Sequence, residues 1–152
     1  MINSYTEQVD RSKPTRFCSN NTVNYVLSDF ASKCEAHEIK FAHLIGVDYI
    51  PTNEIMFSSI LSNALDNALN AVIELPTEQR SVSLMLKSAD DKLLLSVKNP
   101  ISKKPVFSNG LPLSNKKGHG YGTQSIRYMT QKLGGNCQFT ANDEFFMTRV
   151  II

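Results

Sequence analysis

The sequence predicts an α+β domain, a two-layer sandwich in which helices pack on one face of a mostly antiparallel sheet. Three segments carry apolar residues at the spacing of an amphipathic helix, and two pairs of short alternating segments are each joined by a polar turn. The chain has 152 residues, of which 41% are hydrophobic and 20% are charged. These values suit one globular domain with a sizeable core.

The composition narrows the class of protein. A formal net charge of +2 is too small to indicate nucleic-acid binding. The three cysteines form no CxxC pair and the three histidines show no zinc-ligand spacing, so we expect reduced, buried thiols. No stretch is long and apolar enough to span a membrane. Residues 1–15 are polar, lack the apolar core of a signal peptide, and are predicted to be a linker.

The first half of the chain predicts a helix, a strand and a second helix. Apolar residues recur at helical spacing over 20–37, and residues 39–48 are typical of a strand. A longer helix is expected over 54–75, where Thr52 or Asn53 can cap its first turn.

The second half predicts two hairpins separated by a loop and a helix. The first hairpin turns at 88–91 and the second at 142–144. Between them, residues 100–118 contain prolines, glycines and four lysines, and a loop of that length is usually a lid or a binding loop. A helix is expected over 123–133, closed by two glycines.

The helix sequence LSNALDNALNAV, residues 61–72, uses asparagine at its polar positions. Asn63, Asn67, Asn70 and Glu74 lie within an arc of about 60° on a helical wheel. Three asparagines cost up to roughly 2 kcal/mol of helix stability relative to better helix formers. A solvent face that happens to use asparagine is one interpretation. A polar stripe for Mg²⁺ and phosphate is the other, because Mg²⁺ accepts neutral oxygen ligands and shares phosphate oxygens.

The second informative stretch is KKGHGYGTQSIRYMTQKLGG, residues 116–135. Gly118, Gly120 and Gly122 alternate before Thr123, which can cap a helix, and Lys117 adds positive charge beside them. Backbone amides at such a helix start form an anion site. The spacing fits neither a P-loop nor a dinucleotide-binding fold. A glycine loop without a ligand is the alternative interpretation.

The third feature is Asn99, the polar end of the apolar strand LLLSVKNPI. Its amide could hydrogen-bond the edge of a base deep in a pocket. A strand-ending asparagine before Pro100 is the alternative, since asparagine is common where strands turn.

These three stretches, in this order, resemble the ATP-binding domain of the GHKL superfamily, which includes gyrase, heat-shock chaperone, MutL and histidine kinases. The asparagine helix resembles the N box, Asn99 lies at the adenine-binding position of the G1 box, and GHGYGT resembles the G2 box. More closely, LDNALNA, VKNPI and KKGHGYGTQSI resemble the catalytic domains of Gram-positive peptide-sensing histidine kinases, the quorum-sensing type. The resemblance covers nearly the whole chain from Arg16 onward.

The resemblance implies a nucleotide site built from all three motifs. Asn67 would be the Mg²⁺ ligand that bridges metal and phosphates, and Asn63 would lie one turn earlier near the phosphates. Asn99 would bind the adenine amino group. The loop 100–117 would be the ATP lid, hinged at the glycines. The remaining residues implied to contact the nucleotide are Asn70, Ala71, Lys117, Gly118, Gly120, Gly122 and Thr123.

The sequence departs from the superfamily at several positions. Asn99 replaces the usual Asp of the G1 box and no DxGxG follows it, although the peptide-sensing group often carries Asn there. Phe107 is a candidate for the F box. Position 63 is Asn rather than the Glu that gyrase-like ATPases use as general base, so hydrolysis of ATP by water should be slow.

The implied activity is transfer of the γ-phosphoryl group of ATP, with Mg²⁺, to a histidine on a separate dimerisation domain. His37 and His43 do not resemble that phosphoacceptor. Residues 1–15 would be the linker from the dimerisation helix, residues 16–152 the ATP-binding domain. Implied partners are that helix and a response regulator. The domain would be cytoplasmic, in a membrane-bound sensor, without contacting membrane or nucleic acid itself.

Two other functions fit the same motifs. The first is a nucleotide-gated interaction module that binds ATP and transfers nothing. The second is a serine kinase of the anti-sigma type, although its N box normally carries Glu where Asn63 stands.

Overall fold

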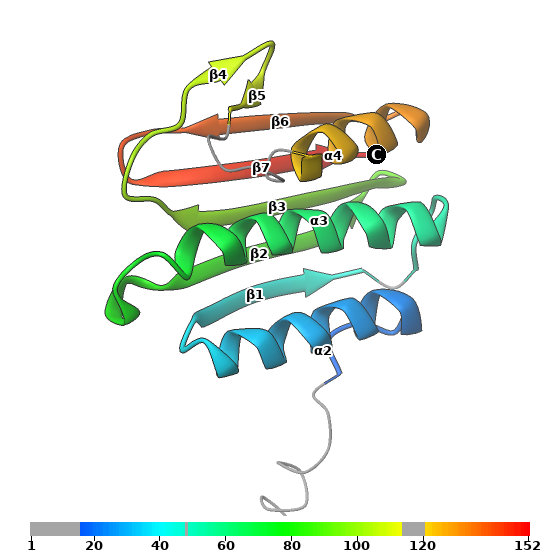
Figure 1. Ribbon diagram of the computed structural model, residues 1–152. Coiled ribbons are helices and arrows are strands. Elements are labelled where there is room, and N and C mark those ends of the chain that lie inside the picture. Colours follow the sequence, from blue (N-terminus) through cyan, green and yellow to red (C-terminus); the bar gives the residue numbers. More distant parts are fainter. Residues whose placement is uncertain (1–15, 48, 114–120) are drawn as a thin grey trace, which may run out of the picture.

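The computed structural model describes residues 16–47, 49–113 and 121–152. Its helices and strands alternate along the chain much as the sequence predicts (Figure 1). In chain order they are helix α2 (Asn21–Ala36), strand β1 (Lys40–Gly46), helix α3 (Glu54–Val72), the short 3₁₀ helix η1 (Thr77–Gln79), strands β2 (Ser81–Ala89), β3 (Lys92–Pro100), β4 (Phe107–Ser108) and β5 (Leu111–Pro112), helix α4 (Tyr121–Lys132), and strands β6 (Asn136–Ala141) and β7 (Phe145–Ile151).

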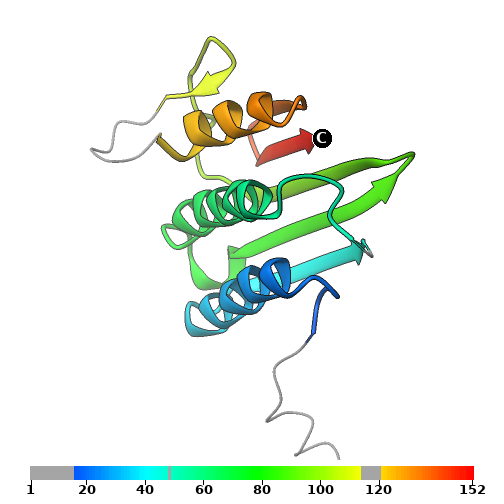
Figure 2. The ribbon, with the colours of Figure 1, turned by 90° about the vertical axis from the view of Figure 1, so that its right-hand side faces the viewer.

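The main sheet has five strands in the order β1-β2-β3-β7-β6. The pair β1–β2 is parallel and the other three pairs are antiparallel. Helices α2, α3 and α4 lie side by side on one face of this sheet, as the two orthogonal views show (Figures 1 and 2). The predicted two-layer α+β sandwich is therefore confirmed.

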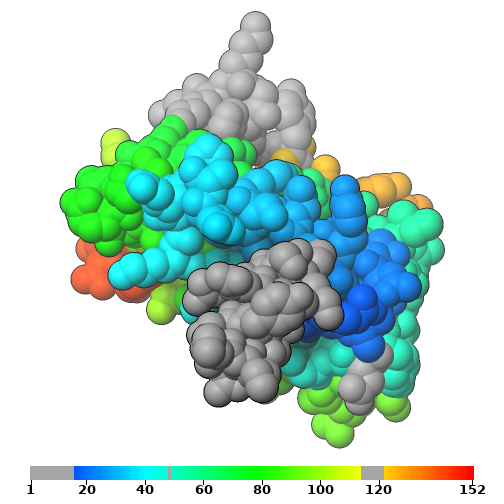
Figure 3. Space-filling model, turned by 90° about the horizontal axis from the view of Figure 1, so that it is seen from below, coloured from blue at the N-terminus to red at the C-terminus, as the bar shows by residue number. Residues whose placement is uncertain are grey.

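Helix α2 forms because its capping residue and its apolar spacing agree. The Asn20 side chain accepts a hydrogen bond from the Val23 backbone N–H at 3.0 Å, which satisfies a donor that the first turn leaves unpaired. Four side chains spaced three or four residues apart are buried against the sheet: Val23, Leu27, Phe30 and Cys34. The helix and strand β1 form the edge of the molecule that faces the viewer in Figure 3.

Helix α3 is the central helix and carries the asparagine stretch. Asn53 caps it by accepting from the Met56 N–H at 2.9 Å, one of the two predicted caps. The helix ends at Val72, three residues before the predicted end. The Arg80 guanidinium donates to the carbonyls of His37, Ile73 and Leu75, so one side chain satisfies acceptors where both α2 and α3 end.

The loop expected over 100–118 contains structure that the sequence analysis did not predict. Strands β4 and β5 form a separate two-stranded sheet. They are joined by Asn109 and Gly110 with φ of 53° and 77°, the left-handed pair of a tight hairpin turn. The Phe107 ring stacks on Phe146 of β7 at 6.4 Å between centroids, and Arg127 of α4 donates to the Asn109 carbonyl. Residues 114–120 lie outside the described residues.

Helix α4 begins two residues earlier than predicted. Thr123 was expected to cap it, but the helix already includes Tyr121, so Thr123 lies inside the first turn and is 2% exposed. The prediction of Thr123 as the N-cap is therefore wrong. The predicted glycine ending is confirmed, because Gly134 has φ of 74° and the Gly135 N–H donates to the Thr130 carbonyl at 2.9 Å.

Candidate functional site

A cavity of about 170 Å³ opens where α3, the ends of β3 and β7, the β4–β5 hairpin and α4 meet. Three of its lining residues come from the three motifs singled out in the sequence: Asn67, Asn99 and Thr123. They are far apart in the chain and reach one hollow because α3 packs over β3 and lies beside α4, which packs over β6 (Figure 1). The full lining is Asn67, Ala71, Asn99, Ile101, Lys103, Pro105, Pro112, Leu113, Thr123 and Phe146.

Helix α3 brings Asn67 and Ala71 to the cavity, one helical turn apart. Asn67 is half-buried, and no hydrogen bond joins its side-chain amide to another residue in the described part of the chain. Its oxygen can therefore serve as a ligand without breaking an existing contact. The small Ala71 side chain leaves room for a flat group beside it.

Strand β3 places Asn99 at the floor of the cavity, where it is 2% exposed. Its Nδ2 donates to the Pro100 carbonyl at 3.0 Å. The remaining Oδ1 is an acceptor, suited to an N–H group of a ligand. A buried amide in this position is costly to leave unpaired, which argues for a polar ligand rather than an empty apolar pocket.

Apolar side chains form the walls around these polar groups. Ile101, Pro112 and Leu113 come from the segment between β3 and α4. Phe146 is held between Phe107 and Phe139, with ring centroids 6.4 and 6.3 Å away. A cavity of this kind, apolar with a few convergent polar groups, suits an aromatic ring with hydrogen-bonding edges.

Charge at the cavity comes from a lysine and not from carboxylates. Lys103 is exposed at the lining, and in the described part of the chain no Asp or Glu lines the hollow. Among the described residues, no group of three or more His, Cys, Asp and Glu side chains could hold a metal ion. The cavity is therefore suited to an anionic ligand.

The three asparagines of the helix stretch 61–72 lie in different environments: Asn67 lines the cavity, Asn63 lines a second hollow, and Asn70 faces solvent. Asn63 lies in a second, more open hollow of about 470 Å³ between α3 and α4, lined also by Ser59, Gln124, Ser125, Tyr128 and Met129. Asn70 is exposed and lines neither hollow. Its contact with nucleotide therefore rests on the resemblance alone.

The glycine motif is only partly described. Gly122 lies half-buried in the first turn of α4, where an added Cβ would meet open space. Gly118, Gly120 and Lys117, all predicted to contact phosphate, lie outside the described residues.

Sequence reasoning missed most of the apolar lining and Lys103. Phe146 lies in the apolar run that begins β7, between the half-buried Phe145 and Met147, and nothing in that run marks it as part of a site. Pro112 and Leu113 reach the cavity only because the β4–β5 hairpin folds back. The Asn109-Gly110 dipeptide was the available signal for that hairpin.

The fold and this cavity define a known class of domain. A family model described as the GHKL domain matches residues 53–152, which include α3, the cavity lining and α4, and the chain belongs to this family. In the described residues, no helix combines the length and apolar character needed to cross a membrane.

Curated and solved proteins with related sequences or folds carry kinase names. The chain is 26% identical over 118 residues to "Sensor histidine kinase CitA" of Klebsiella pneumoniae, covering 71% of this chain but only 21% of that protein. The chain therefore spans about a fifth of the length of the curated relative it matches.

Solved structures share the fold at low sequence identity. The catalytic domain of histidine kinase ThkA superposes with a TM-score of 0.70 at 18% identity, covering 91% of this chain and 93% of that chain. The mycobacterial sensor histidine kinase MprB gives 0.64 at 16% identity, with coverage of 86% and 91%. Full-length ShkA, solved in complex with AMPPNP, gives 0.66 at 14% identity, with coverage of 90% and 30%.

Proposed function

We propose that this domain binds ATP with Mg²⁺ in the cavity and acts as the catalytic domain of a sensor histidine kinase. The observation that carries the proposal is the meeting of Asn67, Asn99 and Thr123, from three separate motifs, at one hollow. Membership of the GHKL family supports it, as do relatives named as histidine kinases and a neighbour solved with an ATP analogue.

In this proposal the cavity binds the adenine base. The Asn99 Oδ1 accepts a hydrogen bond from the 6-amino group, while Ile101, Leu113 and Phe146 contact the ring. Guanine carries a carbonyl at the same position, so two acceptors would face each other. The site would therefore favour ATP over GTP.

Asn67 supplies the protein oxygen for Mg²⁺, and the donor set fits that ion. One neutral oxygen suits a cation that takes its other ligands from phosphates and water. Bound there, Mg²⁺ would neutralise phosphate charge during transfer. Lys117, Gly118, Gly120, Gly122 and Thr123 are proposed to hold the phosphates at the start of α4, and Asn63 to lie near them.

The phosphoryl acceptor is proposed to be a histidine on another domain. An imidazole nitrogen attacks the γ-phosphorus in line, the bond to the β,γ-bridging oxygen breaks, ADP leaves, and the imidazole loses its proton. His37 ends α2, and His43 packs against Phe17 and Phe41 at 4.9 and 5.3 Å between centroids. Neither lines the cavity. The domain thus contributes positioning and charge neutralisation, which require no general base for water.

The remaining partners follow from the same proposal. Residues 1–15 would lead from a dimerisation helix in a longer, membrane-bound sensor, with the domain in the cytoplasm and a response regulator downstream. The narrower peptide-sensing type stays a prediction from the sequence motifs.

A second function has one structural observation in its favour. The β4–β5 hairpin lines the cavity through Pro112 and is joined to α4 by the contact of Arg127 with Asn109. A ligand in the cavity could therefore move the hairpin and change the affinity for a partner, without any phosphoryl transfer.

Calorimetric titration with a non-hydrolysable ATP analogue, with and without Mg²⁺, tests the binding site. In Asn67→Ala we expect Mg²⁺-dependent binding to be lost while the fold stays intact. Asn136→Ala removes the same amide from an exposed position on β6 and should bind like wild type. Unchanged affinity in Asn67→Ala would contradict the assignment.

Phosphoryl transfer then separates the two functions. Wild-type domain mixed with [γ-³²P]ATP and the separately expressed dimerisation domain of its parent should label a histidine. Binding without labelling would favour the gated module.

A further inference from the structure

The face of the main sheet that points away from the helices carries cationic and apolar side chains but no acidic ones. Residues that alternate with the buried set on each strand lie on this face, and the helices occupy the other side (Figure 2). No strand of the main sheet contains Asp or Glu. We call this surface the outer face. Its cations are Lys40, Lys87, Lys92, Lys98 and Arg149.

Apolar residues lie between these cations. The strand register places Leu44 beside Met85, and Leu94 beside both Lys87 and Ile151. The Leu44 side chain is 67% exposed and Ile151 is 44% exposed. A purely solvated sheet face would instead alternate apolar residues inward with polar residues outward. Exposed apolar residues mixed with cations are more typical of a protein–protein interface than of an ordinary solvated surface.

Two of the five cations contact uncharged side chains on the same face. The Lys98 Nζ lies 4.1 Å from the centroid of the Phe145 ring, and the Arg149 Nε lies 3.0 Å from the Met147 Sδ. These are weak partners compared with a carboxylate, which forms a charge-assisted hydrogen bond.

Carboxylates are missing from the face itself. The ion pairs found among the described residues both involve Lys33 on α2, so none of the five cations of the outer face is paired there. The hairpin turns at the ends of the sheet do carry acidic residues: Asp90, Asp91, Asp143 and Glu144. The cations of the outer face therefore have no acidic partner among the described residues.

We propose that the outer face docks an acidic amphipathic helix of a partner protein. Five strands spaced about 4.8 Å apart give a surface roughly 20 Å wide, enough for one helix of about 10 Å diameter. Such a helix offers carboxylates at i, i+4 and i+7 to the lysines and arginine, and apolar residues beside them to Leu44 and Ile151.

Other occupants fit less well. A second copy of this chain would bring like charges together across the contact. An anionic membrane is flat, whereas sheet twist turns the cations of successive strands in different directions, so a plane meets only some of them. A helix can follow one diagonal of a twisted sheet.

The proposal goes beyond nucleotide binding and does not depend on it. The cavity is lined by helix-side residues such as Asn99 and Phe146, which point to the opposite side of the sheet. A partner on the outer face would therefore leave the cavity open.

The test uses a synthetic stapled helical peptide with a stripe of glutamates beside a stripe of leucines, titrated into ¹⁵N-labelled protein at about 150 mM salt. Amide shifts should change on β1, β2, β3 and β7 and not on α3 or α4. The double variant Lys87→Glu with Arg149→Glu reverses two exposed charges and should weaken binding tenfold or more. A variant with Lys132→Glu on α4 makes the same kind of change in the other layer and should bind as wild type.

Each outcome decides between occupants. No peptide binding, shifts confined to the helix layer, or equal affinity in the double variant would overturn the proposal. Binding to phosphatidylserine vesicles in place of the peptide would identify a membrane instead. Self-association in sedimentation that the double variant abolishes would identify a second copy. ATP-analogue affinity, measured on the same variants, should not change, so failure of the nucleotide site is seen separately.

Discussion

At the scale of single residues, Asn99 combines a hydrogen bond within the protein with a proposed role in binding the base, and different substitutions can separate the two. Its Nδ2 satisfies the Pro100 carbonyl and its Oδ1 remains as an acceptor at the cavity. The superfamily's aspartate would provide only acceptors. This position therefore combines a structural hydrogen bond with the proposed recognition of the base.

Replacing Asn99 with Leu keeps the branched shape of the side chain but removes both the Oδ1 acceptor and the Nδ2 donor. We expect affinity for an ATP analogue to fall at least tenfold, with loss of the preference for ATP over GTP, because the adenine amino group would lose its partner. Titration calorimetry with both nucleotides measures this. Asn99→Asp restores an acceptor and should retain the preference. Equal affinity of wild type and Asn99→Leu would show that the base lies elsewhere.

Burial raises the pKa of the Cys34 thiol from 9.0 to about 11. The folded protein therefore holds this proton more tightly than the unfolded chain does. The resulting stabilisation is complete below about pH 9 and is lost as the pH rises through 11.

The free energy of unfolding, measured by urea titration, should reveal this in a comparison of wild type with Cys34→Ala. The wild type should lose up to about 2–3 kcal/mol more than the variant between neutral pH and pH 11. Other groups titrate equally in both proteins and cancel in the difference. A difference that stays constant over this range would contradict the proposed effect of burial.

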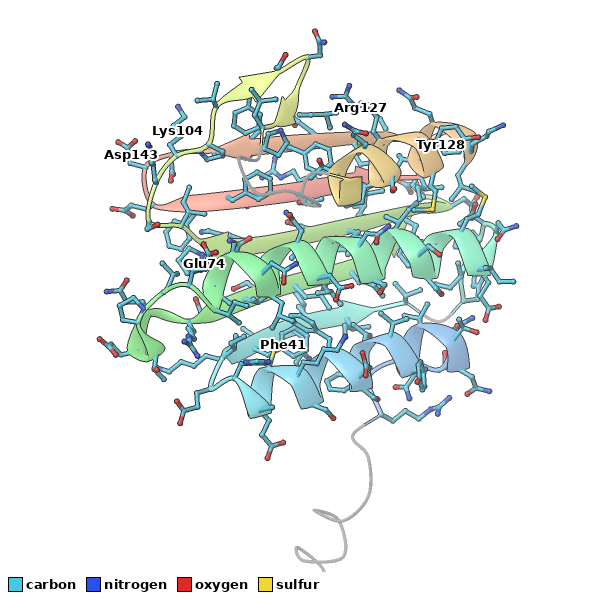
Figure 4. The ribbon with its side chains drawn as sticks, viewed as in Figure 1. Phe41, Glu74, Lys104, Arg127, Tyr128 and Asp143 are labelled. Carbon is cyan, nitrogen blue, oxygen red and sulfur yellow. The ribbon has the colours of Figure 1, made fainter. Side chains whose placement is uncertain are left out.

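At the scale of elements, the β4–β5 hairpin contacts the rest of the described domain at few points. Phe107 stacks on Phe146, and Arg127, labelled above α4 in Figure 4, donates a hydrogen bond to the Asn109 carbonyl in the turn. The Leu113 N–H donates to the Val106 carbonyl at 2.7 Å and closes the hairpin. A small element with few contacts can open without unfolding the main sheet.

Gly110→Ala tests this independence. Gly110 has φ of 77°, and an added Cβ would lie 3.0 Å from the Arg127 Nη2, so the hairpin should lose about 1 kcal/mol of local stability. Hydrogen exchange at Leu113 should become faster and affinity for nucleotide should fall a few-fold, while the melting temperature changes little.

Gly46→Ala is the matched control, because an added Cβ there meets nothing within 4 Å and its φ is not positive. Exchange at Leu113 in this variant should equal that of wild type. A large drop in melting temperature for Gly110→Ala would show that the hairpin is part of the cooperative core.

At the scale of the whole molecule, the sheet order makes the last strand, β7, essential to the fold. Strand β7 lies between β3 and β6, and the backbone groups of Leu93 and Ile152 exchange hydrogen bonds at 2.8 and 2.9 Å. Residues 1–15 were predicted from sequence to be a linker.

Deletion of residues 1–15 should therefore leave the melting temperature within a few degrees of the full chain. Deletion of 145–152 should abolish the cooperative transition, because β6 and α4 lose their connection to the sheet. Thermal unfolding followed by far-ultraviolet circular dichroism measures both. A large destabilisation by the first deletion would contradict the predicted boundary at residue 16.

Much of this architecture could be predicted from the sequence because it depends on local periodicity. The helical spacing of α2 and α3 and the alternation in β2 and β3 mark which residues are buried. The pairing of β3 with β7 could not be predicted in the same way, because it joins residues about a third of the chain apart. The β4–β5 hairpin was missed because strands of two residues show no period.

In the candidate site, the asparagine side chains could be predicted from the sequence, but the apolar residues that form the cavity walls could not. Asn67 and Asn99 are unusual residues for their positions, and their chemistry is visible in the sequence. Phe146 and Leu113 are ordinary apolar residues that become part of the cavity only through tertiary packing.

Strand β7 lies between β3 and β6 in the sheet but follows both of them in the chain, so the sheet can be completed only late in synthesis. A ribosome releases β3 long before β7, so the nascent chain carries β3 with one unpaired edge until residues 145–151 emerge. Helix α4 and β6, made in between, have no completed sheet on which to pack. Such a chain exposes both an open strand edge and apolar surface, the features that lead to aggregation and attract chaperones. The domain should therefore fold late, in a single step, once its final strand has left the exit tunnel.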